Sequence, residues 1–168
     1  MELKTERLIV RELSLDDVKR FSEYRNKKEV AKYQSWKTYS LKKAEKRIDY
    51  CLKHPFQGQI GNYQLGIYLK ANDYLIGDLF LEIDGHTSFT LGYTLDSLYW
   101  SKGYASEAIQ ALFQFMHEEY KFKLCLAHVY EDNKRSVHLL EKNGFQKISK
   151  SWFYQDVLYK KRIDNEDR

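Results

Sequence analysis

The sequence predicts a single domain of the α/β (α+β) class, in which a mixed, mostly antiparallel sheet carries helices on both faces. Strand patterns at 64–70, 74–84 and 89–95 follow one another through short connections, as in antiparallel hairpins. An amphipathic helical pattern, with apolar residues at 105, 108, 109, 112, 113 and 116, then separates them from a further strand pattern at 123–129. The length of 168 residues suits one domain, and a hydrophobic content of 43% with one proline is typical of a folded chain.

The N-terminal part of the chain is expected to form a first strand and a first helix. Residues 8–11 have the strand pattern, and Ser14 with Asp17 three residues later resembles a helix-capping pair. The helix that follows carries apolar side chains at helical spacing, namely Leu15, Val18, Phe21 and Tyr24.

A second helix is expected from Ser40, a suitable N-cap, to the stop at His54-Pro55. The segment 26–38 between the two helices has no clean period but contains Tyr33 and Trp36. Large aromatic side chains are usually mostly buried. Tyr33 and Trp36 could therefore either pack beneath this loop or contact a substrate.

The strands at 74–84 and 89–95 should pair as a hairpin with a defined register. Pairing Leu81 with Leu91 keeps the apolar side chains of both strands on one face of the sheet. The same register places Glu82 beside Thr90.

The end of this hairpin and the start of the next helix together suggest an anion site. One face of the strand at 89–95 is reduced to Thr90, Gly92 and Thr94, and Gly103 opens the helix that follows. The first turn of a helix presents unpaired N–H groups, so a glycine there lets a pyrophosphate approach the backbone. The further glycines of a dinucleotide fingerprint and the Gly-Lys-Ser/Thr ending of a P-loop are absent, which disfavours those two folds.

The C-terminal third is expected to add a strand, a short helix and a final hairpin. The strand at 123–129 is followed by Asn133 as a helix N-cap and by Asn143-Gly144 as the stop of that helix. The stretches 145–148 and 152–159 should form the hairpin.

Composition and charge exclude several classes of protein. The net charge of +4 comes from 28 basic and 24 acidic residues, a near balance that argues against a nucleic-acid-binding surface. Without an apolar signal core or a run long enough for a bilayer, the protein is expected to be cytoplasmic and not membrane-bound. Cys51 and Cys125 lack partners at metal spacing, so we expect buried thiols and no metal. We assign 1–163 to the domain and 164–168 to a polar tail.

The stretch from Trp100 to Ala108 resembles the acetyl-CoA pyrophosphate loop of the GNAT N-acetyltransferases, in their RimJ/RimL-like branch. Three further segments resemble the same branch in the same order, namely Thr5-Glu6-Arg7-Leu8 with Arg11, Asn133 to Ser136 followed by Lys142-Asn143-Gly144-Phe145, and Asp156-Val157-Leu158-Tyr159. The resemblance covers nearly the whole chain, and it implies a splayed cleft between the fourth and fifth strands.

The resemblance also implies which residues contact acetyl-CoA. The pantetheine arm would lie along the backbone of Tyr93, Thr94 and Leu95, and the pyrophosphate on the loop of Trp100, Ser101, Lys102, Gly103, Tyr104, Ala105 and Ser106. Asn133 would contact the arm and Ser136 would lie near the thiol, although both residues also suit helix capping alone. Tyr33 and Trp36 fall where this family builds its acceptor wall.

The chain departs from the family at two catalytic positions. Thr90 stands where many members carry a glutamate as general base, and Leu140 where they carry a tyrosine as general acid. A lysine-type amine, with a pKa of about 10.4, needs a base, whereas an α-amine at about 7.7 to 8.0 is already partly neutral. The chemistry could therefore depend largely on positioning. Glu82, beside Thr90, is a candidate substitute base acting through a water, or else a solvated strand residue.

These observations together predict an acetyl-CoA-dependent N-acetyltransferase that moves an acetyl group to a primary amine by direct transfer in a ternary complex. The missing glutamate and tyrosine keep an alternative open, a non-catalytic acyl-CoA-binding or ribosome-associated module. The amine, a peptide N-terminus or a small molecule, and a homodimeric state are also left open, because one scaffold serves many acceptors.

Overall fold

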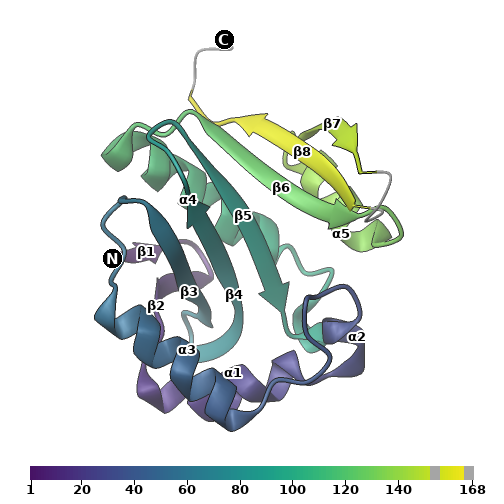
Figure 1. Ribbon diagram of the computed structural model, residues 1–168. Helices are drawn as coiled ribbons and strands as arrows, with labels where there is room; N and C mark the ends of the chain where they lie inside the picture. Colours follow the sequence, from purple (N-terminus) through teal and green to yellow (C-terminus); the bar gives the residue numbers. More distant parts are fainter. Residues whose placement is uncertain (152–155, 165–168) are drawn as a thin grey trace.

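The computed structural model describes residues 1–151 and 156–164, and within them eight strands form one sheet (Figure 1). The strands are β1 (Glu2–Lys4), β2 (Leu8–Glu12), β3 (Gly61–Leu69), β4 (Tyr74–Ile83), β5 (Ser88–Leu95), β6 (Leu124–Tyr130), β7 (Gln146–Lys150) and β8 (Asp156–Arg162). They lie in the order β1-β2-β3-β4-β5-β6-β8-β7, and every neighbouring pair except β5–β6 is antiparallel. The predicted mixed, mostly antiparallel sheet is confirmed.

Helices cover both faces of this sheet, also as predicted. They are α1 (Val18–Arg25), α2 (Lys28–Ala31), α3 (Leu41–Lys53), α4 (Tyr104–Tyr120) and α5 (Lys134–Lys142), with single 3-10 turns η1 (Leu15–Asp17) and η2 (Ser97–Tyr99). Helices α1 and α3 pack on one face of β2–β4, and α4 crosses behind the sheet on the other (Figure 1). None of the helices in the described part of the chain is long and apolar enough to cross a membrane.

The helix boundaries follow from the capping residues in the sequence. The backbone N–H of Ser14 donates to Asp17 at 2.8 Å before α1, and Ser40 Oγ accepts from the Lys43 N–H at 3.1 Å before α3. Gly103 is the N-cap of α4 with a φ of +81°, a backbone conformation that favours glycine.

Two hydrophobic cores lie on opposite faces of the sheet. The larger one packs α4 and α5 against the strands, and its fully buried α4 residues are Ala108, Ile109, Leu112 and Met116. These are positions that the helical period identified. The smaller core lies under α1 and α3, and its members include Phe21, Tyr24, Ala44, Ile48, Tyr68 and Leu75.

The edges of the sheet differ from the sequence prediction. The short β1 precedes the strand expected to be first and pairs Leu3 with Val10. The final pair forms between β7 and β8, but β8 also pairs with β6 and so lies between them. Of the predicted last strand, 152–155 lie outside the described residues, as do 165–168 of the predicted tail. Asp164, assigned to that tail, is instead only 6% exposed.

The register around β5 creates the opening that forms the site. Leu81 pairs with Leu91 and Glu82 with Thr90, as predicted. On its other side β5 pairs with β6 only from Ser88 to Thr90. Beyond Thr90 the two strands diverge, and in the described structure the β6-facing edge of 91–95 pairs with no strand.

Candidate active site

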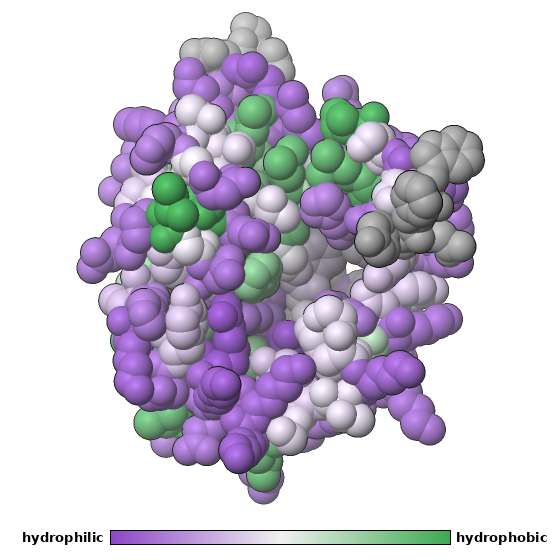
Figure 2. Space-filling model, in the orientation of Figure 1, coloured by the Kyte–Doolittle hydropathy of each residue, from purple (hydrophilic) through white to green (hydrophobic). Residues whose placement is uncertain are grey.

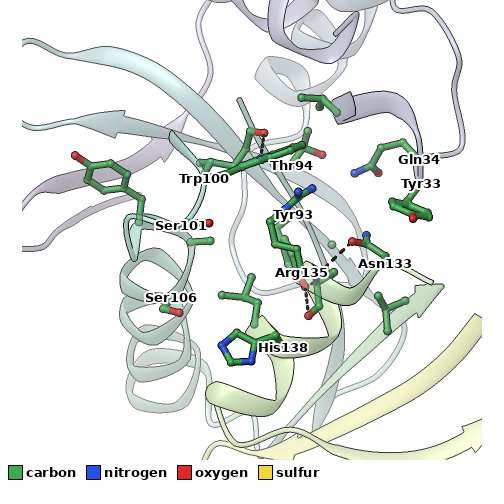
Figure 3. A pocket seen from close by; sticks show the side chains of 18 of the residues that line it. Tyr33, Gln34, Tyr93, Thr94, Trp100, Ser101, Ser106, Asn133, Arg135 and His138 are labelled. Atoms are coloured by element: carbon green, nitrogen blue, oxygen red, sulfur yellow. Dashed lines mark hydrogen bonds between the residues drawn. The ribbon is translucent and has the colours of Figure 1, made fainter. Parts of the chain in front are cut away.

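A cavity of about 680 Å³ occupies the space where β5 and β6 diverge. The molecular surface is hollowed at this place (Figure 2). Its walls are 91–95 of β5, the first turn of α4, one side of α5 and the segment around α2. Figure 3 shows Ser101 and Ser106 on one side of it, Tyr33 and Gln34 on the other, and Arg135 between them. The cavity therefore joins the helix terminus identified from sequence to the loop that carries Tyr33.

The first turn of α4 is held in place by the N-terminal segment of the chain. The Arg7 guanidinium donates to Glu107 at 2.7 Å and to the carbonyl of Lys102 at 2.9 Å, and the Arg7 N–H donates to Glu107 at 2.8 Å. Burial disfavours ionisation of Glu107, but hydrogen bonds from Thr5 and Arg7 outweigh it and lower the pKa of the carboxyl. These contacts give the Thr5-Glu6-Arg7-Leu8 segment a physical role, because they fix the loop before α4.

Asn143, which does not itself line the cavity, connects α4 to α5. Its side-chain N–H donates to Ser106 Oγ at 2.9 Å and to the carbonyl of Leu139 at 2.8 Å. Its side-chain carbonyl accepts from Gln110 at 2.9 Å. The residue is 6% exposed, so this amide fixes the spacing between the two helices that border the cavity.

Three side chains of α5 that carry basic groups line the same cavity, and none of them was predicted as a site residue, although two fall within segments that resemble the family. They are Arg135, His138 and Lys142. The Arg135 guanidinium lies 3.1 Å from the centre of the Trp100 ring, and the Trp100 indole N–H donates to the Leu95 carbonyl at 2.8 Å. Burial lowers the pKa of Arg135. The three α5 residues have i, i+3, i+7 spacing, which places them on one face of the helix, and this spacing is the sequence signal from which they could have been predicted.

A tyrosine and a serine meet in the middle of the cavity. The Tyr93 hydroxyl makes a short hydrogen bond with Ser136 Oγ, a contact drawn in Figure 3. Burial raises the pKa of Tyr93 to about 12, further above neutral pH than that of an ordinary tyrosine. Asn133 Oδ1 accepts from the Ser136 N–H at 3.3 Å, which is the predicted helix cap.

The loop around α2 forms the opposite wall. The Tyr33 hydroxyl donates to the Asp132 carbonyl at 3.1 Å, and its ring centre lies 6.4 Å from that of Tyr130. Glu29 also lines the cavity and accepts a hydrogen bond from Ser97 at 2.7 Å, which lowers the pKa of the Glu29 carboxyl.

Trp36, predicted together with Tyr33, does not line the cavity. Its indole N–H donates to the Arg25 carbonyl at 2.9 Å, and the Arg25 guanidinium lies 3.9 Å from its ring centre. The ring also packs against Tyr39, whose ring centre is 5.4 Å away. Of the two aromatic residues, Trp36 belongs to the smaller core and Tyr33 to the cavity wall.

Glu82 and Lys102 are two further predicted residues that do not line the cavity. Glu82 is exposed beside Thr90, where β5 and β6 are still paired, and the cavity begins only at Leu91. Lys102 is exposed, and its carbonyl is occupied by Arg7. The predicted cofactor positions that do line the cavity are Tyr93, Thr94, Leu95, Trp100, Ser101, Gly103, Tyr104, Ala105, Ser106, Asn133 and Ser136.

Comparison with known proteins agrees with this architecture. The family model of the acetyltransferase (GNAT) domain matches residues 7–146. A protein of Bacillus licheniformis named uncharacterized N-acetyltransferase p20 is 31% identical over 148 residues, or 86% of this chain and 82% of that protein.

Two solved structures have a similar fold. A GNAT-family acetyltransferase from Bacillus anthracis superposes with a TM-score of 0.83 at 22% identity, over 97% of this chain and 99% of that chain. RimL, described as a ribosomal L7/L12 alpha-N-protein acetyltransferase in complex with coenzyme A, gives a TM-score of 0.83 at 17% identity, over 98% of this chain and 99% of that chain. With the family match over most of its length, the chain belongs to the GNAT family of acetyltransferases.

Proposed function

We propose that the protein transfers an acetyl group from acetyl-CoA to a primary amine, with both substrates bound together in the cavity. One observation carries this proposal: the N-terminus of α4, which suits an anion, and the β6-facing edge of β5, which pairs with no strand of the described residues beyond Thr90, border the same cavity. Such a cavity suits a long anionic donor at one end and leaves the end near Tyr33 for an acceptor.

The residues present fit acetyl-CoA. Gly103 has no side chain to cover the first turn of α4, which lets a pyrophosphate reach the N–H groups there. In the described structure the β6-facing edge of β5 from Leu91 to Leu95 pairs with no strand. Apart from the Leu95 carbonyl, which accepts from Trp100, this edge offers backbone groups to the pantetheine amides, as an added strand would use them. Arg135 and Lys142 supply positive charge for phosphate groups. When bound, acetyl-CoA supplies an acetyl group activated as a thioester.

The chain's own residues can hold the proton that a departing thiolate requires. Tyr93 is protonated at neutral pH, as an ordinary tyrosine also is, and its hydrogen bond to Ser136 places a hydroxyl proton at this point of the cavity. A thiol has a pKa of about 8.5, so only modest assistance is needed. In this proposal the Tyr93–Ser136 pair has the general-acid role that the resemblance assigns to a tyrosine at the position of Leu140.

The acceptor would reach the cavity from the side of α2. Tyr33 and Tyr130 provide aromatic surface there, and Glu29 provides a carboxylate. A protein N-terminus, the kind of acceptor named for RimL, and a small-molecule amine both remain candidates under this proposal.

The test is acetyl-CoA turnover with a panel of alkylamines, polyamines and peptides, followed by thiol release and by mass spectrometry of the amine. Acetylated amine formed in proportion to thiol supports the proposal. Tight CoA binding by calorimetry without turnover on any amine would instead favour a non-catalytic acyl-CoA-binding module.

A further inference from the structure

Two side chains at the acceptor end of the cavity have no part in the function described so far. His128 of β6 and Asp156 of β8 both line it, and His128 Nδ1 lies 3.3 Å from Asp156 Oδ2. Their strands are hydrogen-bonded neighbours in which His128 pairs with Leu158 and Asp156 with Tyr130. The pair is therefore held by the sheet itself rather than by a loop.

The environment of the Asp156 carboxylate favours a cation. Its Oδ1 is buried and accepts no hydrogen bond from any residue in the described ranges 1–151 and 156–164, while 28% of the side chain remains exposed. A carboxylate with one oxygen removed from solvent is incompletely screened. It should therefore attract a cation that approaches its accessible side more strongly than a fully hydrated carboxylate would.

Charge is distributed unevenly along the cavity. The cations Arg135 and Lys142 lie along α5, whereas the lining carboxylates are Glu29 and Asp156. The basic side suits an anionic donor, and the carboxylates suit a positively charged acceptor. An alkylamine with a pKa near that of lysine is such an acceptor at neutral pH.

We propose that Asp156 and His128 bind the acceptor as its ammonium form and remove its proton, so that the substrate class is a basic primary alkylamine. This inference rests on the proposed function and supplies a base inside the cavity, which neither Thr90 nor Glu82 lines. With Nδ1–H donated to Asp156, the His128 Nε2 lone pair is free to accept a proton.

The proton transfer balances without any further reactant. One N–H bond of the ammonium breaks, a bond from that proton to His128 Nε2 forms, and the amine keeps the electron pair with which it acts as nucleophile. Asp156 stabilises the imidazolium that results. Because the His128 side chain is 56% exposed, the proton can then pass to bulk water.

Other titratable groups surround this pair and bear on any pH profile. Tyr130 and Lys160 lie on the same two strands, and Glu29 and Tyr33 lie across the cavity. Glu131 of the β6–α5 loop and Lys150 of β7 lie beside the cavity. Lys150 already pairs with Glu131 at 2.5 Å, which reduces the influence of that lysine on Asp156.

The kinetic test compares His128→Gln and Asp156→Asn with wild type, using butylamine as acceptor. Both variants should lose about a hundredfold or more in kcat/KM. His128→Gln should act mainly on kcat and move the rising limb of the pH profile to that of free butylamine, while Asp156→Asn should also raise KM. His86→Gln, an exposed histidine in the β4–β5 turn, is a matched control that should keep the wild-type profile. The inference would be overturned if His128→Gln and Asp156→Asn kept the wild-type kcat/KM and the wild-type rising limb of the pH profile.

A binding test needs no acetyl-CoA and so separates this inference from the proposed function. In ¹⁵N-histidine spectra, neutral His128 should be the Nδ1–H tautomer in wild type and a mixture in Asp156→Asn. Butylammonium chloride should shift the His128 resonances, and butanol at the same concentration should not. Equal responses to both probes, or none, would refute the ammonium site. Failure of every amine to be acetylated would instead refute the proposed function.

Discussion

Replacing Gly103 with valine tests the anion site at the start of α4 most directly. Gly103 has a φ of +81°, and a Cβ built on it would lie 3.3 Å from Arg7 Nη2. A β-branched residue in this left-handed conformation costs roughly 1–2 kcal/mol. For a chain of this size the melting temperature should therefore fall by roughly 2–8 °C.

The effect on CoA should be larger than the effect on stability. A side chain at this position holds the pyrophosphate away from the N–H groups of the first turn. Each charge-assisted hydrogen bond lost is worth about 1.5–3 kcal/mol. Loss of one such bond predicts an increase of about ten- to a hundredfold in the dissociation constant of CoA, measured by calorimetry.

Two further variants separate strain from blocking. Gly103→Asn tolerates the left-handed backbone but still adds a side chain, so it should lose affinity with little loss of stability. Gly144 has a φ of +82° at the end of α5 and does not line the cavity. Gly144→Val should therefore lose stability and keep its CoA affinity. If Gly103→Val and Gly103→Asn bind CoA as tightly as wild type, the pyrophosphate does not lie at this loop.

Three other predictions follow from the contacts around the cavity. Asn133→Asp keeps the oxygen that caps the Ser136 N–H but loses the amide donor, so the melting temperature should hold while the KM for acetyl-CoA rises several-fold. A lower melting temperature with an unchanged KM would mean that Asn133 serves only as a helix cap. Tyr93→Phe removes the buried phenol, and steady-state kinetics should show kcat reduced about tenfold or more at unchanged KM for the amine. The pKa of Glu107 is lowered in the fold, so its stabilising contribution is present above the unfolded value of about 4.3 and is lost as pH falls through the lower folded value. In urea titrations the stability difference between wild type and Glu107→Gln should accordingly shrink below about pH 4, whereas a constant difference would contradict the ion pair with Arg7.

The sequence by itself determined the features that depend on near neighbours along the chain. The apolar period of α4 predicted its buried face, and Ser40 and Asn133 predicted helix starts, because each pattern repeats within a few residues. The β4–β5 register also followed from alternation, since a shift by one residue would have exposed the apolar face of the hairpin. The GNAT family itself was predicted from short segments, and the family match confirms it.

The tertiary structure decided which of the candidate residues meet. Alternation defines the faces of a strand but not its neighbours in the sheet, so the position of β8 beside β6, which brings Asp156 to His128, could not be predicted. Trp36 had the same local character as Tyr33, yet packing against Arg25 placed it in the core. Glu82 had the predicted neighbour, but the cavity begins only after Thr90. The point at which β5 and β6 part depends on pairing between strands separated by the whole of α4, which no short-range pattern records.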